Sequence, residues 1–213
     1  MPRTPRFVVP GLPHHIAQRG NYRQPVFFSP GDRLYFLRHL ERRARQSGID
    51  VLGWCLMSNH FHLIAIPSLD TSFSLGLRAL LSEYTLHINA RQERPRGHLW
   101  QGRFYSCALP GARVWTALRY VELNPVRAGL VAAPEQYRWS SARFHLDLEP
   151  APALLNHARH PMMPAAEWAE CLRAGAKPDE EIELRRCTLS GRPCGAPAPP
   201  RGRPKIGTAP LLL

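Results

Sequence analysis

Hydrophobic and polar positions along the first 125 residues follow two different periods, and the changes between them predict seven elements. Short apolar or alternating runs bounded by turn residues predict strands, whereas apolar residues three and four positions apart predict helices. Ser29 and Pro30 are suited to the start of one helix, and Gly48 is suited to its end. The predicted strands cover residues 14–19, 51–57, 60–66 and 104–109, and the predicted helices cover residues 30–47, 72–91 and 112–123.

This order, β-α-β-β-α-β-α, is the ferredoxin-like order with one added helix. It predicts an α+β fold in which an antiparallel sheet carries helices on one face. The regular pattern fades after residue 146, and residues 147–213 contain 11 of the 22 prolines. We therefore expect two parts: a folded domain over residues 1–146 and a Pro-rich extension with short helices over residues 147–213.

Charge adds a class of partner to this picture. The chain has 213 residues and a formal net charge of +12, of which residues 1–146 carry +11 and residues 147–213 carry +1. An excess of this size favours a polyanionic partner, most simply nucleic acid. The hydrophobic content of 44% is sufficient for a core of ordinary size.

Composition also excludes several classes of protein. No apolar run approaches the ~20 residues of a membrane span, and the N-terminal sequence has no signal-peptide pattern. The five cysteines form no C-x-x-C pair, which disfavours a disulfide scaffold or a Cys-rich zinc module. We expect free thiols, a cytoplasmic location and no membrane partner.

His60 and His62 are the first candidate for chemistry. Side chains alternate between the two faces of a strand, so both histidines share a face while Phe61 and Leu63 take the other. Two neutral imidazoles that lie two residues apart on one face of a strand can bind one divalent ion. They leave most of its coordination sphere open for a substrate. The spacing alone leaves open that both are ordinary core or surface histidines.

Tyr120 and Asn124 are the second candidate. They lie four residues apart on the last predicted helix and therefore share a face. Pro125 disfavours helical geometry at Asn124, so the helix should end or kink there. An asparagine at this position can offer its amide oxygen to an ion, and a tyrosine one turn earlier can offer its hydroxyl to a bound group. A half-buried tyrosine followed by an asparagine C-cap is the alternative.

Together these motifs resemble the single-tyrosine HUH transposases, and in particular the REP-associated tyrosine transposase branch. The resemblance covers about residues 7–145. It is carried by the stretches 14–21 (HHIAQRGN), 55–63 (CLMSNHFHL), 97–105 (GHLWQGRFY) and 120–130 (YVELNPVRAGL).

The resemblance implies a metal-dependent transposase that cleaves and rejoins single-stranded or hairpin DNA. His60, His62 and Asn124 would hold Mg²⁺ or Mn²⁺, and Tyr120 would form a 5′-phosphotyrosine intermediate. The phosphotyrosine conserves the bond energy, so no nucleotide cofactor is expected. The family also implies a bacterial, nucleoid-associated protein that acts as a monomer or a homodimer. Many relatives have Gln where this chain has Asn124.

Two other tyrosines could compete with Tyr120 as nucleophile. Tyr84 precedes His87 by three residues on the long predicted helix, a spacing that could mimic a nucleophile and its base. Tyr105 lies in the last predicted strand. We expect Tyr120 to be the nucleophile because the resemblance gives that role to the tyrosine of the stretch 120–130.

Arginines interleaved with aromatic residues are candidates for contacts with single-stranded DNA. Trp100 could stack bases, with a buried core position as the alternative. The other candidates are all arginines: Arg19, Arg96, Arg103, Arg119, Arg127, Arg201 and Arg203.

The extension carries three further patterns. Arg201 and Arg203 belong to a segment similar to an AT-hook, which lies in the minor groove of A·T-rich DNA, although a solubilising basic tail would look alike. Asp179, Glu180 and Glu181 are expected to form a solvated acidic face. Residues 188–195 resemble the C-terminal extension of the family, without an evident role.

Two other functions remain open at this point. A non-catalytic, basic nucleic-acid-binding protein with a ferredoxin-like fold would share the charge and the element order. A metal hydrolase that releases a free product would share the histidine pair.

Overall fold

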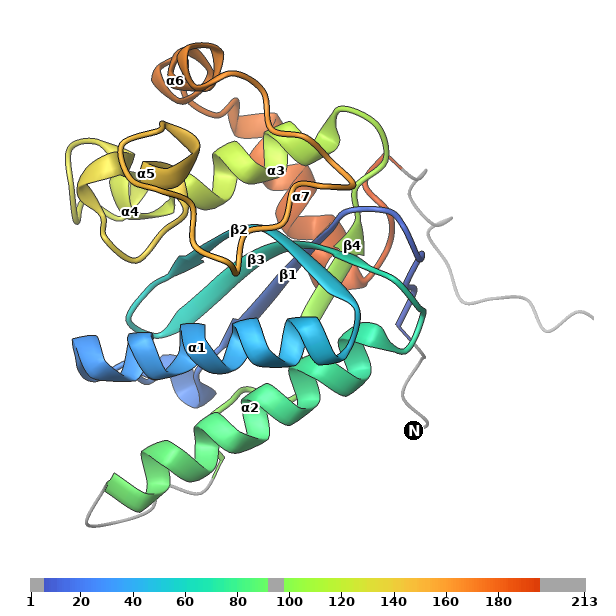
Figure 1. Cartoon of the computed structure of the whole chain (residues 1–213), viewed down its shortest axis with the longest axis vertical. Helices are drawn as coiled ribbons and strands as arrows, with labels where there is room; N and C mark the ends of the chain where they lie inside the picture. Colours follow the sequence, from blue (N-terminus) through green and yellow to red (C-terminus); the bar gives the residue numbers. More distant parts are fainter. Residues whose placement is uncertain (1–5, 92–97, 196–213) are drawn as a thin grey trace, which may run out of the picture.

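The computed structural model describes residues 6–91 and 98–195 and forms an α+β fold around one four-stranded sheet (Figure 1). The strands β1 (His14–Arg19), β2 (Ile49–Leu56), β3 (His60–Pro67) and β4 (Tyr105–Ala108) lie in the order β2-β3-β1-β4, and every pair is antiparallel. This is the predicted ferredoxin-like strand order, and the predicted α+β fold is confirmed.

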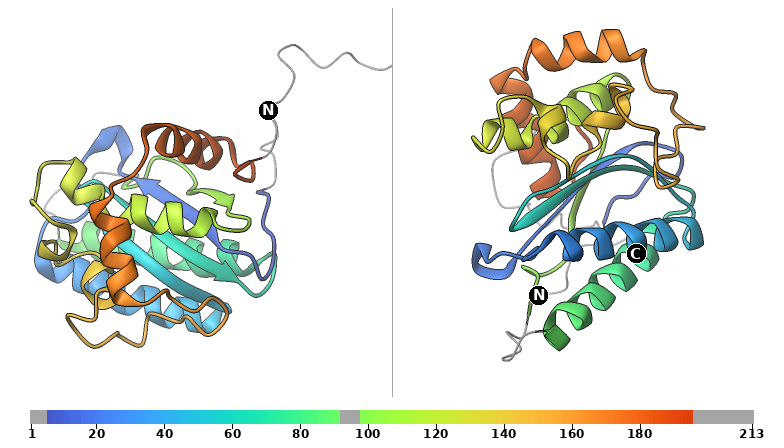
Figure 2. Two further views of the ribbon diagram at one scale, coloured as in Figure 1. Left: turned by 90° about the horizontal axis from the view of Figure 1, so that it is seen from above. Right: turned by 60° about the vertical axis from the view of Figure 1, so that its left-hand side comes forward.

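Helices α1 (Pro30–Gln46) and α2 (Ser72–Arg91) cover one face of the sheet, as Figure 2 also shows. Helix α1 begins with a capping box, in which the Ser29 hydroxyl accepts from the Asp32 amide and the Asp32 carboxylate accepts from the Ser29 amide. Arg91, the last residue of α2, pairs with the same Asp32 carboxylate and so ties the two helices together.

The other face is also covered, which the prediction of helices on one face did not include. Helix α3 (Arg113–Glu122) crosses β2 and β3, and α7 (Pro178–Ser190) lies against β4 and β1. The remaining elements are short or peripheral: η1 (Asn21–Arg23), α4 (Asn124–Arg127), η2 (Pro134–Gln136), α5 (Ala142–His145) and α6 (Ala165–Arg173). None of the helices within residues 6–91 and 98–195 is long and apolar enough to cross a membrane.

The alternation of β3 divides the core into two clusters. Phe61, Leu63 and Ala65 pack with α1 and α2, whereas Ile64 and Ile66 pack on the opposite face with α3. This second cluster also contains buried residues from beyond position 146, among them Trp168 from α6 and Leu184 from α7. Residues on both sides of the expected division at residue 146 therefore share one core, and the division itself stays a prediction.

Helix α3 approaches the sheet closely at Gly53. The register of β2 shifts between Val51 and Gly53, and a Cβ atom at Gly53 would lie 2.7 Å from Cδ2 of Leu118 and 2.9 Å from Oγ of Ser141. Leu118 is itself buried, so it has little room to move away. A glycine at position 53 lets α3 pack close to the sheet. This close packing determines how far the side chains of α3 lie from β3.

A buried carboxylate anchors α5 and α6 to this helix. Glu122 is 0% exposed and accepts hydrogen bonds from Ser141 Oγ at 2.5 Å, His145 Nδ1 at 2.6 Å and Trp168 Nε1 at 2.8 Å. Its two oxygens thus satisfy three donors from the segment that follows α3. A buried carboxylate costs free energy unless it is hydrogen-bonded in this way.

We predict that Glu122→Gln lowers the free energy of unfolding by about 1–3 kcal/mol, because the amide turns an N–H group toward one of these donors and leaves it unpaired. Glu170→Gln is the matched control, since Glu170 is exposed on α6, and it should change stability by less than about 0.5 kcal/mol. Urea denaturation measures both. Equal stability of the two variants would contradict the anchoring role of Glu122.

Candidate active site

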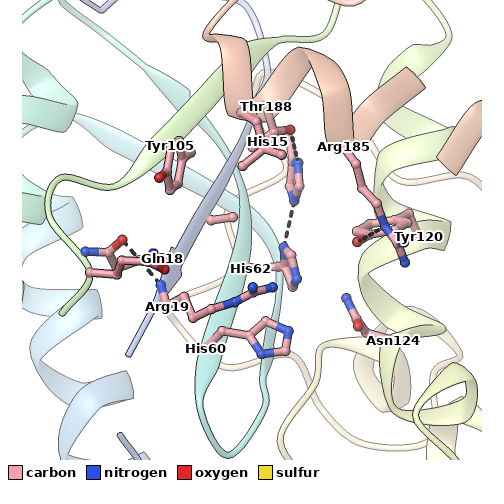
Figure 3. A pocket seen from close by; sticks show the side chains of 13 residues that line it. His15, Gln18, Arg19, His60, His62, Tyr105, Tyr120, Asn124, Arg185 and Thr188 are labelled. Carbon is pink, nitrogen blue, oxygen red and sulfur yellow. Dashed lines mark hydrogen bonds between the residues drawn. The ribbon is translucent and has the colours of Figure 1, made fainter. Parts of the chain in front are cut away.

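A cavity of about 490 Å³ opens on the α3 side of the sheet and brings the predicted site residues together (Figure 3). Strands β1 and β3 form its floor, α3 and α4 one wall, and α7 another. Its chemistry-bearing lining residues are His15, Gln18, Arg19, His60, His62, Gln101, Tyr105, Tyr120, Asn124, Arg185 and Thr188. The histidine pair and the tyrosine-asparagine pair, which are separate motifs in the sequence, therefore meet in one place.

The two histidines share the cavity face of β3, as the strand period predicts. Their ring centroids are 5.0 Å apart. Burial, with a smaller contribution from the nearby Arg19 charge, lowers the pKa of His60 to about 4. Burial also lowers the pKa of His62 well below its usual value, with smaller contributions from His15, His60 and two arginines. Both rings are therefore neutral near pH 7 and can act as ligands.

The side chain of Asn59 determines which nitrogen of His60 carries the proton. Asn59 Nδ2 donates to the Arg23 carbonyl at 3.1 Å, so its Oδ1 is the atom that faces His60 Nδ1 at 2.7 Å. An amide oxygen can only accept, which requires the proton of His60 to be on Nδ1. The lone pair is then on Nε2, the nitrogen that remains available to an ion.

Tyr120 is placed against His62 by the apolar stripe of α3. Val114, Leu118 and Val121 are buried against the sheet, and the Tyr120 ring centroid lies 5.6 Å from that of His62. Its hydroxyl accepts a hydrogen bond from Arg185 Nε at 3.1 Å.

Arg127 holds the same tyrosine from the other side. Its guanidinium lies 4.1 Å from the centre of the Tyr120 ring and donates to the Tyr120 carbonyl at 2.9 Å. Tyr120 is consequently 5% exposed, yet its ring borders the cavity. The hydroxyl has no carboxylate beside it among the contacts that the described residues make.

Asn124 lies one turn beyond Tyr120 and borders the same cavity. As Pro125 predicts, α3 ends at Glu122, and the short α4 begins at Asn124. The Asn124 side-chain nitrogen is buried without a hydrogen-bond partner among the described residues. An unpartnered buried amide beside two neutral imidazoles is compatible with a role as an ion ligand, because rotation of the amide presents its oxygen instead.

These three side chains are the residues that could hold a metal. Within residues 6–91 and 98–195, no group of three or more His, Cys, Asp or Glu side chains converges as a metal site. The available donor set is therefore two imidazoles and one amide oxygen. This mixed nitrogen and oxygen set is compatible with Mn²⁺ and, by ligand hardness, less well matched to Mg²⁺.

The competing tyrosines differ sharply in their surroundings. Tyr84 is 0% exposed, lies on α2 beneath the opposite face of the sheet and donates its hydroxyl proton to the Val26 carbonyl at 2.7 Å. Burial raises its pKa, so it is poorly placed to become a nucleophile. His87 stacks on Tyr35 at 3.7 Å between ring centroids. Tyr105 borders the cavity from β4, across from Tyr120 in Figure 3.

Two of the candidate DNA-binding arginines are engaged within the chain. Arg119 pairs with Glu180 and Arg127 pairs with Glu181, each at 2.5 Å. The expectation that residues 179–181 form a solvated acidic face was therefore wrong for Glu180 and Glu181, because α7 presents them to the arginines of α3 and α4. Long-range pairing of this kind has no signature in local charge patterning.

The remaining candidate DNA contacts are spread over the molecule. Arg19 is exposed at the cavity, and Arg103 is exposed near Trp100. Trp100 itself is 8% exposed and donates to the Leu81 carbonyl at 3.2 Å, which supports the alternative of a core position. Arg96, Arg201 and Arg203 lie outside the described residues.

Three cavity residues that were not singled out from the sequence form hydrogen bonds with Tyr120, with His62 or with each other. His15 comes from β1, within a motif that was noted only for its resemblance, and Arg185 and Thr188 come from α7. The one sequence signal for Thr188 was its position in the segment that resembles the extension of the family. Arg185 had no signal of its own, because its contact with Tyr120 joins positions 65 residues apart.

Two solved structures are similar to this chain. A solved structure of a REP-associated tyrosine transposase bound to a REP hairpin matches with a TM-score of 0.56 and 21% sequence identity, over 76% of this chain and 94% of that chain. At this identity the match establishes a shared fold. A putative transposase from Deinococcus radiodurans R1 matches with 18% identity and a TM-score of 0.40, over 57% of this chain and 96% of that chain. The comparison with curated proteins gave no match.

A comparison with protein-family models gives a further match. The family model described as IS200-like transposase matches residues 8–124, which is more than half of the chain. The matched segment contains both histidines, Tyr120 and Asn124. The chain therefore belongs to the IS200-like transposase family and is a transposase enzyme.

Proposed function

We propose that this transposase cleaves and rejoins single-stranded or hairpin DNA through a covalent bond between Tyr120 and a 5′-phosphate. The observation that supports this most directly is the meeting of Tyr120 with His60 and His62 in one open cavity, with 5.6 Å between the Tyr120 and His62 ring centroids. A nucleophile and a ligand pair at this distance can act on one phosphodiester.

In the proposed reaction the Tyr120 hydroxyl oxygen attacks phosphorus. The bond from phosphorus to the 3′-oxygen breaks, the phenol loses its proton, and the 3′-oxygen gains one to become a free hydroxyl. Attack by a 3′-hydroxyl on the phosphotyrosine reverses these steps and rejoins the strand. Arg185 and Arg127 hold the tyrosine in place through its hydroxyl and its ring.

His60, His62 and Asn124 would hold a divalent ion, Mg²⁺ or Mn²⁺. Such an ion polarises the phosphodiester and stabilises the charge that builds on its oxygens. The neutral state of both histidines, the free Nε2 of His60 and the unpartnered amide of Asn124 support this donor set.

One chain contributes every residue of the proposed site. The histidines on β3 and the tyrosine on α3 already face each other without a second subunit. This supports a monomer as sufficient for cleavage. The DNA partner and the REP-associated branch are supported by the similar structure that was solved with a REP hairpin, together with the net charge of +12.

We predict that Tyr120→Phe abolishes the covalent adduct, because the variant lacks the attacking oxygen. Tyr84→Phe is the matched control. It loses only a hydrogen bond to Val26 on the other face of the sheet and should still form the adduct. A denaturing gel of labelled single-stranded hairpin DNA, incubated with Mn²⁺ or Mg²⁺, measures both. An adduct with Tyr120→Phe would refute the assignment, while cleaved product without an adduct would indicate a hydrolase.

A second prediction concerns the metal. The wild type should bind one Mn²⁺ ion, and His62→Ala should weaken binding by more than about 100-fold, since a ligand matters more than the outer-shell partners that cost 10–100-fold. His39→Gln on α1 is the control and should bind as the wild type does. Isothermal titration with MnCl₂ in the absence of DNA measures the affinity. Unchanged affinity in His62→Ala would mean that the ion binds elsewhere.

A third prediction concerns the charge at the cavity. Arg19 is exposed beside the histidines, so Arg19→Gln should weaken binding of single-stranded DNA and reduce the slope of log K against log salt by about 0.7. Arg45→Gln removes an equal charge from the far face, where Arg45 pairs with Glu41, and should leave the slope unchanged. Fluorescence anisotropy across a salt series tests this. Affinity of the wild type that is flat in salt would contradict phosphate contacts altogether.

A further inference from the structure

A chain of hydrogen bonds runs from α7 of the extension to the candidate ligand His62. Thr188 Oγ1 lies 2.7 Å from His15 Nδ1, and His15 Nε2 lies 2.9 Å from His62 Nδ1 (Figure 3). The three side chains are 3%, 1% and 7% exposed, so water does not compete for these contacts. The chain ends at the Leu184 carbonyl, which lies 2.8 Å from Thr188 Oγ1.

The Leu184 carbonyl, at the far end of this series of hydrogen bonds, determines which atom donates in each of them. A carbonyl oxygen can only accept, so the contact with Leu184 requires the single hydroxyl proton of Thr188. Thr188 Oγ1 must then accept from His15 at its other side, which places the proton of His15 on Nδ1. His15 is buried and no carboxylate contacts it among the described residues, so its ring is neutral, and its Nε2, which then has no proton, must accept from His62.

His62 consequently donates through Nδ1 and keeps the lone pair on Nε2. The opposite order would put a proton on Nε2 of His62 and would leave two oxygens, of Thr188 and Leu184, facing each other at 2.8 Å without a proton between them. That arrangement is unfavourable in a buried site. Cys107 does not disturb the order, since its thiol at 3.3 Å from Thr188 Oγ1 can donate to the same oxygen.

We propose that Thr188 and His15 are positioning residues that hold His62 as the tautomer with its lone pair on Nε2, ready to bind a divalent ion. The proposal rests on the proposed function, because it takes His62 as a ligand. It assigns a role to α7: Thr188, which is 173 residues from His15 in sequence, orients a ligand that it does not itself contact. The hydrogen bond to the neighbouring Asn59 holds His60 in the same tautomer.

The test uses the full chain and removes only the hydroxyl. Thr188→Val keeps the side-chain shape but can neither accept from His15 nor donate to Leu184. Thr188→Ser keeps the hydroxyl and should restore the wild-type state. Thr85→Val on α2 is the matched control, because the Thr85 hydroxyl makes the same bond to a carbonyl four residues earlier, at 2.7 Å from Leu81, away from this cavity.

The first readout is the tautomer of His62 in the metal-free protein, measured by long-range ¹H–¹⁵N correlation of the histidine rings. We expect the wild type, Thr188→Ser and Thr85→Val to carry the proton on Nδ1, and Thr188→Val to show a proton on Nε2 in a substantial fraction of molecules. A wild-type spectrum with the proton on Nε2 overturns the proposal, even if the valine variant does not fold. A valine variant that retains the wild-type tautomer also overturns it.

The second readout is the affinity for Mn²⁺ alone. Thr188→Val should lose about 10–100-fold, the usual cost of removing an outer-shell partner, whereas Thr188→Ser and Thr85→Val should stay within about threefold. Equal affinity of the valine and serine variants overturns the proposal. Neither readout uses DNA, so a wild type that forms no covalent adduct refutes the proposed function while the tautomer of His62 still decides this inference.

Discussion

The position of Tyr120 depends on how closely α3 lies on the sheet. The contact is made at Gly53, where any larger residue would press on Leu118 and Ser141. Because Val114, Leu118 and Val121 fill the space beneath the helix, its remaining face turns Tyr120 toward the cavity. The strand beneath supplies His60 and His62 on that same side. The candidate site is therefore a direct consequence of one helix packing against one strand.

Charge pairing then attaches the extension to this core. Glu180, Glu181 and Glu183 on α7 face Arg119, Arg127 and Arg113, respectively. The net charge of residues 147–213 is close to zero and gives no sign of this arrangement. Their acidic groups neutralise arginines of residues 1–146. Partly exposed ion pairs of this kind contribute little free energy each. Their effect here is to set the orientation of α7, while buried Leu184 and Cys187 provide the apolar contact.

The sequence predicted the parts of the site that depend on local periodicity. The alternation in β3 identifies the shared face of His60 and His62, and the helical period groups Tyr120 with Asn124. The order of strands and helices up to residue 123 also followed from the pattern, because each of these elements has its own local period. Contacts that join distant elements left no such trace: Arg185 with Tyr120, and Thr188 with His15, are each a single pair of residues 65 and 173 positions apart. Trp100 illustrates the same limit, since its burial depends on α2 and not on its neighbours in sequence.

In the proposed site, His60 and His62 adopt the same tautomer, with the proton on Nδ1, for different structural reasons. His60 is oriented by the residue before it, so the strand that carries the ligand also carries its partner. His62 is oriented through β1 by a helix that lies beyond the region matched by the family model, which ends at residue 124. In the proposed ligand pair, only His60 is oriented from within the segment that the family model matches. In this proposal α7 has a direct effect on the site. Without α7, the proton on His15 has no acceptor to fix its position, and His62 loses the constraint that keeps its Nε2 free of a proton.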